Sequence, residues 1–475
     1  MGVRGNVPTV VLQTRRRKRE TVTVLSQNPW APRESRGVFH LATPASIVAL
    51  TRRVKFLPLL APLLALLRAV PASGARAPDD FFDRMDEALT VSAFHDQVRA
   101  RLSGTLDLEG YQFDFPAPGL VFTKYDALFN PRLTLFLDAQ IGPRIYVFAQ
   151  ARADRGFDPS DRAAEVRLDE YALRVTPWED GRWHFQIGKF ATIVGNWAAR
   201  HGSWENPFIT APLPYENLTG IWDSAAARTS ATLFSWAHVR DGLGGFFGDE
   251  RADKILRLPI IWGPAYTSGL AAFGQIGKFD YAVDCKNAAL ASRPESWDGT
   301  QVQWQHPTVS ARVGFRPNAM FRLGFSASGG SYLHPDAAPT VAPGHSLADY
   351  REIVFGQDFA FAWHRWQVWA ELYEARFEIP NVGNADTFAY YVEARYKITP
   401  QLCGALRWNQ QLFSSVRNGE GGRTQWGREI WRLDTALGYR LNAHTQLKLQ
   451  YSFQHEDDAP RAFGHTLAAQ FTVRF

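Results

Sequence analysis

Residues 465–475 place apolar side chains on one face at a period of two, which is the period of a β-strand. The apolar face consists of Leu467, Ala469, Phe471, Val473 and Phe475, and the other face consists of Thr466, Ala468, Gln470, Thr472 and Arg474. An unbroken apolar stripe that ends on an aromatic residue suits a strand facing lipid, where the ring lies at the interface. A half-buried strand at the edge of a soluble sheet is the alternative.

The same two-residue period runs through most of the chain from Ser103 onward. It predicts eighteen strands, or sixteen, because the stretch 223–286 is ambiguous. The candidate strands are 103–115, 131–141, 144–153, 165–177, 183–190, 228–240, 255–262, 267–274, 278–286, 308–316, 321–329, 351–363, 366–378, 386–398, 401–413, 429–441, 444–455 and 465–475. Tilted strands of about ten residues cross a bilayer, and single-chain bacterial barrels have even strand numbers. The sequence therefore predicts an all-β fold, a transmembrane antiparallel β-barrel over residues 103–475, with 16 strands and 18 as the alternative.

The connections between these strands alternate between short and long. Short connections include 142–143 and 442–443, and long ones include 330–350 and 414–428. Short periplasmic turns and long external loops produce this alternation in membrane barrels, whereas a soluble sandwich has no reason to show it.

Charged side chains keep to one face of each well-phased strand. In 308–316, Val309 and Val313 oppose Arg312, and in 444–455, Leu447 opposes Lys448. A lysine or arginine that faces lipid near the midplane costs about 2–4 kcal/mol. We therefore expect the charged face of each strand to line the inside of the barrel.

An apolar run near the amino terminus has the features of a secretory signal peptide. Residues 56–67 follow a basic stretch and lead into small residues that end at Ala75, the expected cleavage site. The run is too short to span a bilayer, which takes about 20 residues. We expect residues 51–75 to be the signal peptide and residues 1–50 to be an artefact of the assigned gene start. A genuine basic tail is the alternative for residues 1–50.

Residues 76–102 follow a different pattern from the rest of the chain. Phe82, Met85 and Leu89 recur at helical spacing among acidic residues. This spacing predicts a short periplasmic helical segment ahead of the barrel, with a loosely ordered tether as the alternative.

Removal of residues 1–75 reverses the sign of the net charge. The chain has 52 Lys and Arg against 47 Asp and Glu, a formal net charge of +5. Residues 1–75 contain twelve basic and two acidic residues, so the remainder carries −5. The basic isoelectric point is therefore no reason to expect nucleic-acid binding. We also expect no catalytic residues, no cofactor and no metal site, because no nucleophile, metal-ligand or phosphate-loop motif occurs.

Basic residues outnumber acidic residues on the predicted inner face. The basic set is Arg132, Arg174, Arg312, Arg316, Arg322, Arg395, Lys397, Arg407, Arg432, Arg440, Lys448 and Arg474. The acidic set is Asp138, Glu170, Glu371, Glu393 and Asp434. Twelve basic side chains against five acidic ones favour the passage of anions. Ion pairs across the wall, which would leave a weakly selective pore, are the alternative.

The longest connection, residues 191–227, is rich in Trp, Asn and Pro. Loops of this length are usually functional or disordered, and the aromatic content disfavours disorder. We expect the loop to fold into the barrel and narrow the pore, with Arg200 and His201 near the constriction. An external cap packed on its own aromatic residues is the alternative.

Two parts of the sequence resemble known families. The ending with Phe471, Val473 and Phe475 resembles the carboxyl-terminal signature of bacterial outer-membrane barrels, which the outer-membrane assembly machinery reads. Residues 183–190, which end in Gly188, Lys189 and Phe190, together with the upstream strand, are similar to a motif of the phosphate-selective porin O/P family. This resemblance implies a sixteen-stranded, trimeric porin that is general or anion-preferring.

We therefore expect an outer-membrane porin for the passive diffusion of small hydrophilic, anionic solutes, with outer-membrane lipids as its surroundings. Two other functions stay open. One is an outer-membrane barrel with an occluded lumen that acts as an enzyme or binds lipid. The other is a secreted, soluble β-rich protein that binds carbohydrate through its many Trp residues.

Overall fold

A computed structural model of the protein describes residues 80–114, 119–121, 123, 125–154, 165–237, 257–298, 304, 306–457, 459 and 462–475. The expected signal peptide and the extension before it lie outside these residues, so both stay predictions. Among the helices in this part of the chain, none is long and apolar enough to cross a membrane.

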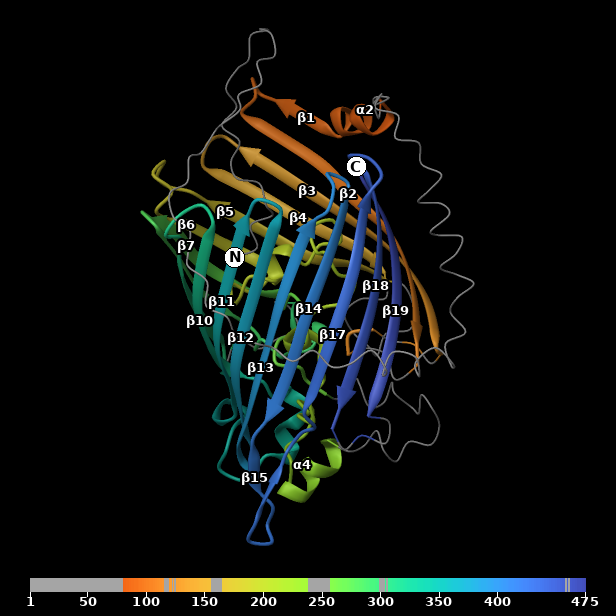
Figure 1. The fold of residues 1–475 in the computed structure, drawn as a ribbon. Helices are drawn as coiled ribbons and strands as arrows, with labels where there is room; N and C mark the ends of the chain where they lie inside the picture. The colour runs from red at the N-terminus through yellow and green to blue at the C-terminus, as the bar shows by residue number, and fades with distance from the viewer. Residues whose placement is uncertain are drawn as a thin grey trace, which may run out of the picture. The chain divides into compact units, whose positions relative to one another are not determined.

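Sixteen antiparallel strands form a closed ring (Figure 1). Each strand pairs with the next one along the chain, and β19 returns to pair with β2. The sixteen strands are β2 (Val98–Phe113), β3 (Ala127–Ile141), β4 (Ile145–Asp154), β5 (Glu165–Val175), β6 (His184–Phe190), β7 (Thr267–Ile276), β8 (Phe279–Lys286), β9 (Thr308–Phe315), β10 (Phe321–Ser331), β11 (Arg351–Trp363), β12 (Trp366–Ile379), β13 (Gly383–Lys397), β14 (Leu402–Phe413), β17 (Ile430–Arg440), β18 (Thr445–Glu456) and β19 (Phe463–Arg474). The predicted barrel is confirmed, with the lower of the two strand numbers.

Two of the eighteen candidate strands are wrong. The described part of 228–240 forms the helix α4 (Ser230–Ala237). In 257–262 the only β-bridge joins Arg257 to Trp222. Leu258 and Trp262 are completely buried, and the Trp262 N–H donates to the Leu290 carbonyl at 2.8 Å. An apolar run that is buried on all sides resembles a strand in sequence, but here loops rather than neighbouring strands satisfy its backbone.

The side chains alternate across the barrel wall as predicted. On β9, Val309 and Val313 are each 51% exposed, whereas Arg312 between them is 4% exposed. On β18, Lys448 is 2% exposed, and Tyr451 on the other face is 40% exposed. The outer surface is therefore apolar and the inner surface charged, as a barrel in lipid requires.

The amino-terminal segment consists of a helix and a short strand beside the barrel rim. The predicted helix is α2 (Asp80–Ala88), and β1 (Thr90–Ala93) pairs with the start of β2. The His444 ring stacks on Phe82 with 5.1 Å between centroids. The barrel begins at Val98 and not at Ser103, because the apolar alternation of Val98, Ala100 and Leu102 already belongs to β2.

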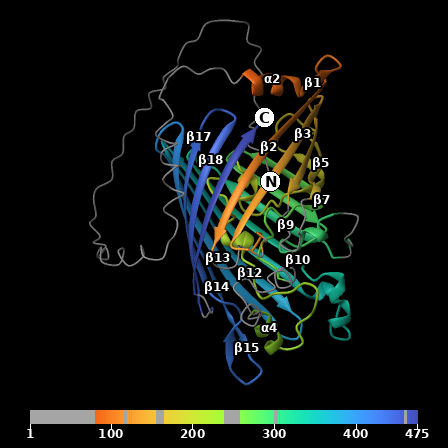
Figure 2. The same ribbon diagram turned by 90° about the vertical axis from the view of Figure 1, so that its right-hand side faces the viewer.

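The two ends of the barrel are built differently. α2 and β1 lie at the end that also holds the carboxyl terminus, and α4 and β15 lie at the other (Figure 1, Figure 2). The hairpin β15 (Ser415–Arg417) and β16 (Arg423–Gln425) and the short helices η5 (Pro335–Thr340) and η6 (Leu347–Asp349) extend loops that the sequence predicted to be long. By contrast, only two residues join β11 to β12.

The seam between β2 and β19 closes on the last residue of the chain. Gly104 donates to the Phe475 carbonyl at 2.9 Å, and the Phe475 N–H donates back to the Gly104 carbonyl at 3.0 Å. A Cβ atom at position 104 would lie 2.5 Å from the Phe475 ring and 3.0 Å from the Thr134 carbonyl oxygen. The terminal aromatic ring therefore fits into the space that Gly104 leaves free.

We predict that Gly104→Val lowers the fraction of the protein that folds. The added side chain would displace the Phe475 ring, and overpacking of this kind costs about 1–3 kcal/mol. Heat-modifiable migration on gels after refolding into detergent measures the folded fraction.

The matched control is Gly110→Val on the same outward face of β2, where an added Cβ has no heavy atom within 4 Å. Gly110→Val should fold like the unmodified protein. An equal loss of folding in both variants would contradict the role of Phe475 in closing the seam.

Candidate functional site

Residues 191–227 and 257–266, which belong to the connection between β6 and β7, fold into the lumen of the barrel. This loop contains η3 (Ala198–Arg200) and α3 (Leu213–Glu216). Val194, Tyr215 and Trp262 in the loop are completely buried. The segment after β8 joins it, because Trp297 packs edge-on against Tyr266 at 5.8 Å. The two segments form apolar clusters with inward-facing residues of β12 to β14.

Glu371 of β12 fixes the loop to the barrel wall. One carboxylate oxygen accepts the backbone N–H groups of Asn196 and Trp197 at 2.5 and 2.8 Å. The other accepts the hydroxyls of Tyr215 and Tyr373 at 2.7 and 3.1 Å. The Glu371 side chain is completely buried. Four donors around one buried carboxylate make a strong and direction-specific attachment.

Arg200 makes the next attachment of the loop to the wall. It donates to Glu393 at 2.7 Å and to the Tyr391 hydroxyl at 2.9 Å. Its guanidinium carbon lies 4.5 Å from the centroid of the Trp369 ring. Burial by itself lowers the pKa of Arg200, but Glu393, Tyr391 and Glu371 together outweigh burial and raise that pKa above its usual range. Arg200 therefore stays charged, and Glu393 neutralises it.

Ion pairs continue along the wall beneath the loop. Arg407 is completely buried, 2.8 Å from Asp434 and 3.7 Å from Glu393. Arg432 also pairs with Asp434, at 3.1 Å, and with Glu216 of α3. The loop thus supplies partners for wall charges that are removed from water, where an unpaired charge is costly.

Basic residues of β17 to β19 hold the tip of the loop. The Lys448 ammonium donates to the carbonyls of Ser203 and Asn206, the latter at 2.8 Å. The Trp204 ring lies 5.1 Å from the Arg440 guanidinium and 4.2 Å from that of Arg474. These contacts keep the segment 203–206 against the wall.

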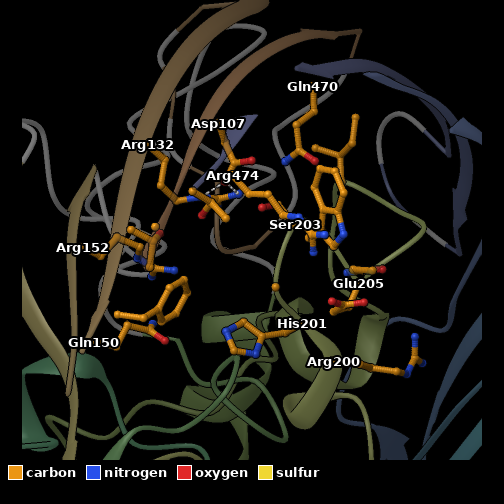
Figure 3. Close-up of a pocket in the computed structure, with 18 of the residues that line it drawn as sticks. Asp107, Arg132, Gln150, Arg152, Arg200, His201, Ser203, Glu205, Gln470 and Arg474 are labelled. Carbon is orange, nitrogen blue, oxygen red and sulfur yellow. Dashed lines mark hydrogen bonds and ion pairs between the residues drawn. The ribbon is translucent and has the colours of Figure 1, made fainter. Parts of the chain in front are cut away.

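The wall formed by β2 to β5 carries its own ion pairs. Arg132 lies 3.2 Å from Asp107 and 2.5 Å from Glu109. Arg152 lies 3.0 Å from Asp169. In Figure 3, Arg132 and Arg152 lie on one side of the cavity and Arg200 on the other.

A cavity of about 990 Å³ separates these two sides inside the barrel. It runs from Asp83 and Asp86 of α2 to Gln150 and His201 (Figure 3). The His201 ring is fixed by the Tyr266 hydroxyl, 2.6 Å from its Nε2 atom. The lining is polar and charged along most of its length, so this space suits water and hydrophilic solutes.

Four of the ten predicted pore residues line this cavity: Arg132, Arg200, His201 and Arg395. The other six lie elsewhere on the inner wall. Arg407 and Lys448 are buried beneath the loop. Arg312, Arg316 and Arg322 surround Asp280 at 2.9, 3.3 and 3.0 Å. Arg174 bonds to Gln186 at 2.9 Å and lies over the Phe273 ring.

The sequence interpretation missed most acidic partners of the inner face. Asp107, Glu109, Asp280 and Asp358 all face inward and pair with arginines. The signal was available, because Asp107 and Glu109 alternate with Leu106 and Leu108. The predicted excess of twelve basic over five acidic residues is therefore wrong as a description of the lumen. Six of the twelve predicted basic residues pair with carboxylates.

On the inner face of β13 to β19, three of the described arginines have no carboxylate within ion-pair distance. These are Arg395, Arg440 and Arg474; the last donates to the Ala443 carbonyl at 3.0 Å. Arg395 and Arg474 line the cavity. Uncompensated positive charge is therefore present on the side of the lumen formed by β13 to β19, in addition to Arg174 of β5.

Comparisons with known proteins extend to the fold alone. No family model and no curated protein matches the sequence. The outer-membrane channel DcaP of Acinetobacter baumannii superposes with a TM-score of 0.50 at 11% identity, over 81% of this chain and 100% of that chain. The anion-selective porin from Comamonas acidovorans gives 0.49 at 11% identity, over 80% and 100%. OmpT of Vibrio cholerae in its trimer form gives 0.46 at 10% identity, over the same shares.

The sixteen-stranded ring and the likeness to the DcaP channel define the class of fold. The chain is an all-β, antiparallel barrel of the kind found in bacterial outer-membrane porins. The identity of 11% shows nothing about solutes or assembly. Those properties have to be argued from the side chains of this chain.

We predict that Glu371→Gln loosens the lumen loop without unfolding the barrel. An amide presents an NH₂ group where the carboxylate now accepts two hydrogen bonds, and a buried mismatch of this kind costs about 1–3 kcal/mol. Hydrogen exchange at the amides of Asn196 and Trp197, followed by mass spectrometry, should become about tenfold faster or more.

Glu374→Gln is the control, because Glu374 is exposed on the other face of β12. Exchange at residues 196 and 197 should not change in this variant. Unchanged exchange in Glu371→Gln itself would show that the loop is held by other contacts.

Proposed function

We propose that the protein is a porin of the bacterial outer membrane, through which small hydrophilic solutes diffuse passively, and that it has no enzymatic activity. One observation carries this proposal: a closed ring of strands has an apolar outside and a charged inside around a cavity. Leu406 and Val309 on the outside are 52% and 51% exposed, and an apolar belt of this extent is unfavourable in water. The belt supports a place in lipid, and the cavity supports the passage of solutes.

The proposed preference for anions is weak. It rests on Arg395, Arg440 and Arg474, which lack carboxylate partners among the described residues. It does not rest on the total number of basic residues, because ion pairs cancel half of the twelve predicted ones. Uncompensated positive charge in a narrow, low-dielectric space attracts anions.

A barrel with an occluded lumen is the second candidate, as an enzyme or a lipid-binding protein. The observation that favours it is the apolar cluster of the lumen loop, in which Trp262, Tyr266 and Trp297 are almost completely buried. A soluble carbohydrate-binding protein is disfavoured by the apolar outer belt. Conductance separates the first two candidates directly.

We also propose that three copies assemble through the outer face of β2 to β4. The described outward positions of these strands carry no Trp or Tyr, as is also true of β7, β9 and β10, whereas β12, β13, β14 and β17 carry Trp366, Tyr396, Trp408 and Trp431. Aromatic residues of that kind mark contact with the lipid interface. A wall without them suits contact with another protein. Membership of the phosphate-selective porin O/P family, and recognition of Phe471, Val473 and Phe475 by the assembly machinery, stay predictions.

We predict that the purified protein forms conducting channels in planar bilayers with a modest preference for chloride over potassium. The double variant with Arg440→Gln and Arg474→Gln should lower the permeability ratio of anion to cation by about twofold or more, since it removes uncompensated positive charge from the lumen. The reversal potential in a salt gradient measures this ratio.

Arg376→Gln provides the control for a change in total charge. Arg376 is exposed on the outer face of β12 and pairs with Asp386 at 2.7 Å. Its loss should leave the reversal potential unchanged. Folded protein that never conducts would favour the occluded barrel, and a preference for cations would refute the proposed selectivity.

We predict that Ala149→Arg, on the outer face of β4, dissociates the assembly. An arginine there would meet a neighbouring subunit, whereas Ala272→Arg on β7 places the same charge on a wall outside the proposed interface. Mass measurement in detergent should give a trimer for Ala272→Arg and a monomer for Ala149→Arg. A monomeric unmodified protein, or equal behaviour of the two variants, would rule out this interface.

A further inference from the structure

Two neighbouring polar side chains of the inner wall have buried atoms without partners. Arg395 of β13 and Gln367 of β12 are direct partners in the strand register, and both line the cavity. The Arg395 Nε atom and the Gln367 Oε1 atom are buried and make no hydrogen bond. A donor and an acceptor that lie side by side would ordinarily bond to each other or to a third group. Both side chains also reach the cavity, where a third group can approach their outer atoms.

The positive charge of Arg395 is not cancelled by the wall. The nearest acidic residue along the same face of β13 is Glu393, and Arg200 and Arg407 already neutralise it at 2.7 and 3.7 Å. No described carboxylate lies within ion-pair distance of Arg395. The guanidinium of Arg395 is therefore free to bind an anion from the cavity.

A small side chain lies on one side of Arg395, and an aromatic side chain lies on the other. Its register partner on β14 is Ala405, whose methyl group leaves the guanidinium unobstructed. Trp369, the next inward residue of β12 after Gln367, also lines the cavity. A ligand held by Arg395 would thus have an indole ring beside it.

We propose that Arg395 and Gln367 form a binding subsite for the carboxylate group of small organic anions that pass through the lumen. This inference rests on the proposed channel function. The two oxygens of a carboxylate match the paired N–H groups of a guanidinium. The Gln367 amide NH₂ group donates to the same carboxylate, and the organic part of the ligand lies beside Trp369, whose ring Arg200 also contacts.

The number of donors favours a carboxylate over inorganic phosphate. Phosphate carries up to two negative charges at neutral pH and takes several donors, whereas the subsite offers one guanidinium and one amide. The apolar contact with Trp369 adds binding energy only for a ligand with an organic body.

Block of the chloride current in planar bilayers tests the subsite. We expect sodium benzoate to reduce the current with a saturable dose dependence, and acetate to be weaker because it lacks the ring. Inorganic phosphate should be weaker than benzoate at equal ionic strength. In Arg395→Gln, the concentration of benzoate that halves the current should rise about tenfold, the loss expected for a charge-assisted hydrogen bond.

Lys397→Gln is the matched control. It removes one positive charge from the same face of β13, at an exposed position near the rim. In Lys397→Gln, the concentration of benzoate that halves the current should change less than twofold. Equal effects of Arg395→Gln and Lys397→Gln would show that any positive charge on this face has the same effect, and would overturn the proposal. Stronger block by phosphate than by benzoate would also overturn it.

Calorimetry with benzoate on the folded protein in detergent separates this proposal from the channel function. Saturable binding that is lost in Arg395→Gln supports the subsite even where no current flows. A conducting channel without saturable block and without calorimetric binding overturns the subsite and leaves the channel intact.

Discussion

The closed ladder of backbone hydrogen bonds is the constraint on which the rest of this structure depends. Lipid offers no partners for N–H and C=O groups, so a spanning sheet cannot leave an edge open. The pairing of β19 with β2 removes that edge, and the two bonds between Gly104 and Phe475 complete it. Closure also fixes which face of every strand points inward. The division into an apolar outside and a charged inside follows from it.

A charged interior creates a second constraint, because a charge removed from water has to be paired. The wall strands alone do not supply all the partners. The loop between β6 and β7 provides Arg200 for Glu393 and Glu216 for Arg432. The loop is therefore part of the electrostatics of the wall as well as an obstacle within the lumen. The few arginines that it leaves without partners set the field that a solute meets.

Alternation predicted the barrel and the facing of Val309 and Arg312, and helical spacing predicted the helix near Phe82, because local pattern determines these features. The alternation pattern also misled. It failed at residues 228–240 and 255–262, where burial by distant residues decides the conformation. It also failed for the charge of the lumen. Arg312 looked free in the sequence, but Asp280 and Asp358, from two other strands, neutralise it. Such neutralisation depends on contacts between strands that are distant in the sequence. The register of the strands has to be known before ion pairs can be assigned.

The lumen is tightly packed at one end and hollow at the other, which explains why a single residue such as Arg395 can affect the passage of a solute. Phe413, Val416 and Trp426 belong to the apolar cluster that contains Trp262, so the loop is packed tightly toward the end that holds β15. The cavity lies on the side of α2 and ends near Arg200 and His201. A solute in this space is enclosed by protein, where Coulomb interactions are weakly screened. In a wide, water-filled barrel a single uncompensated guanidinium would be screened within about 10 Å. Here the contacts of Glu371 that hold the loop in place also keep Arg395 effective.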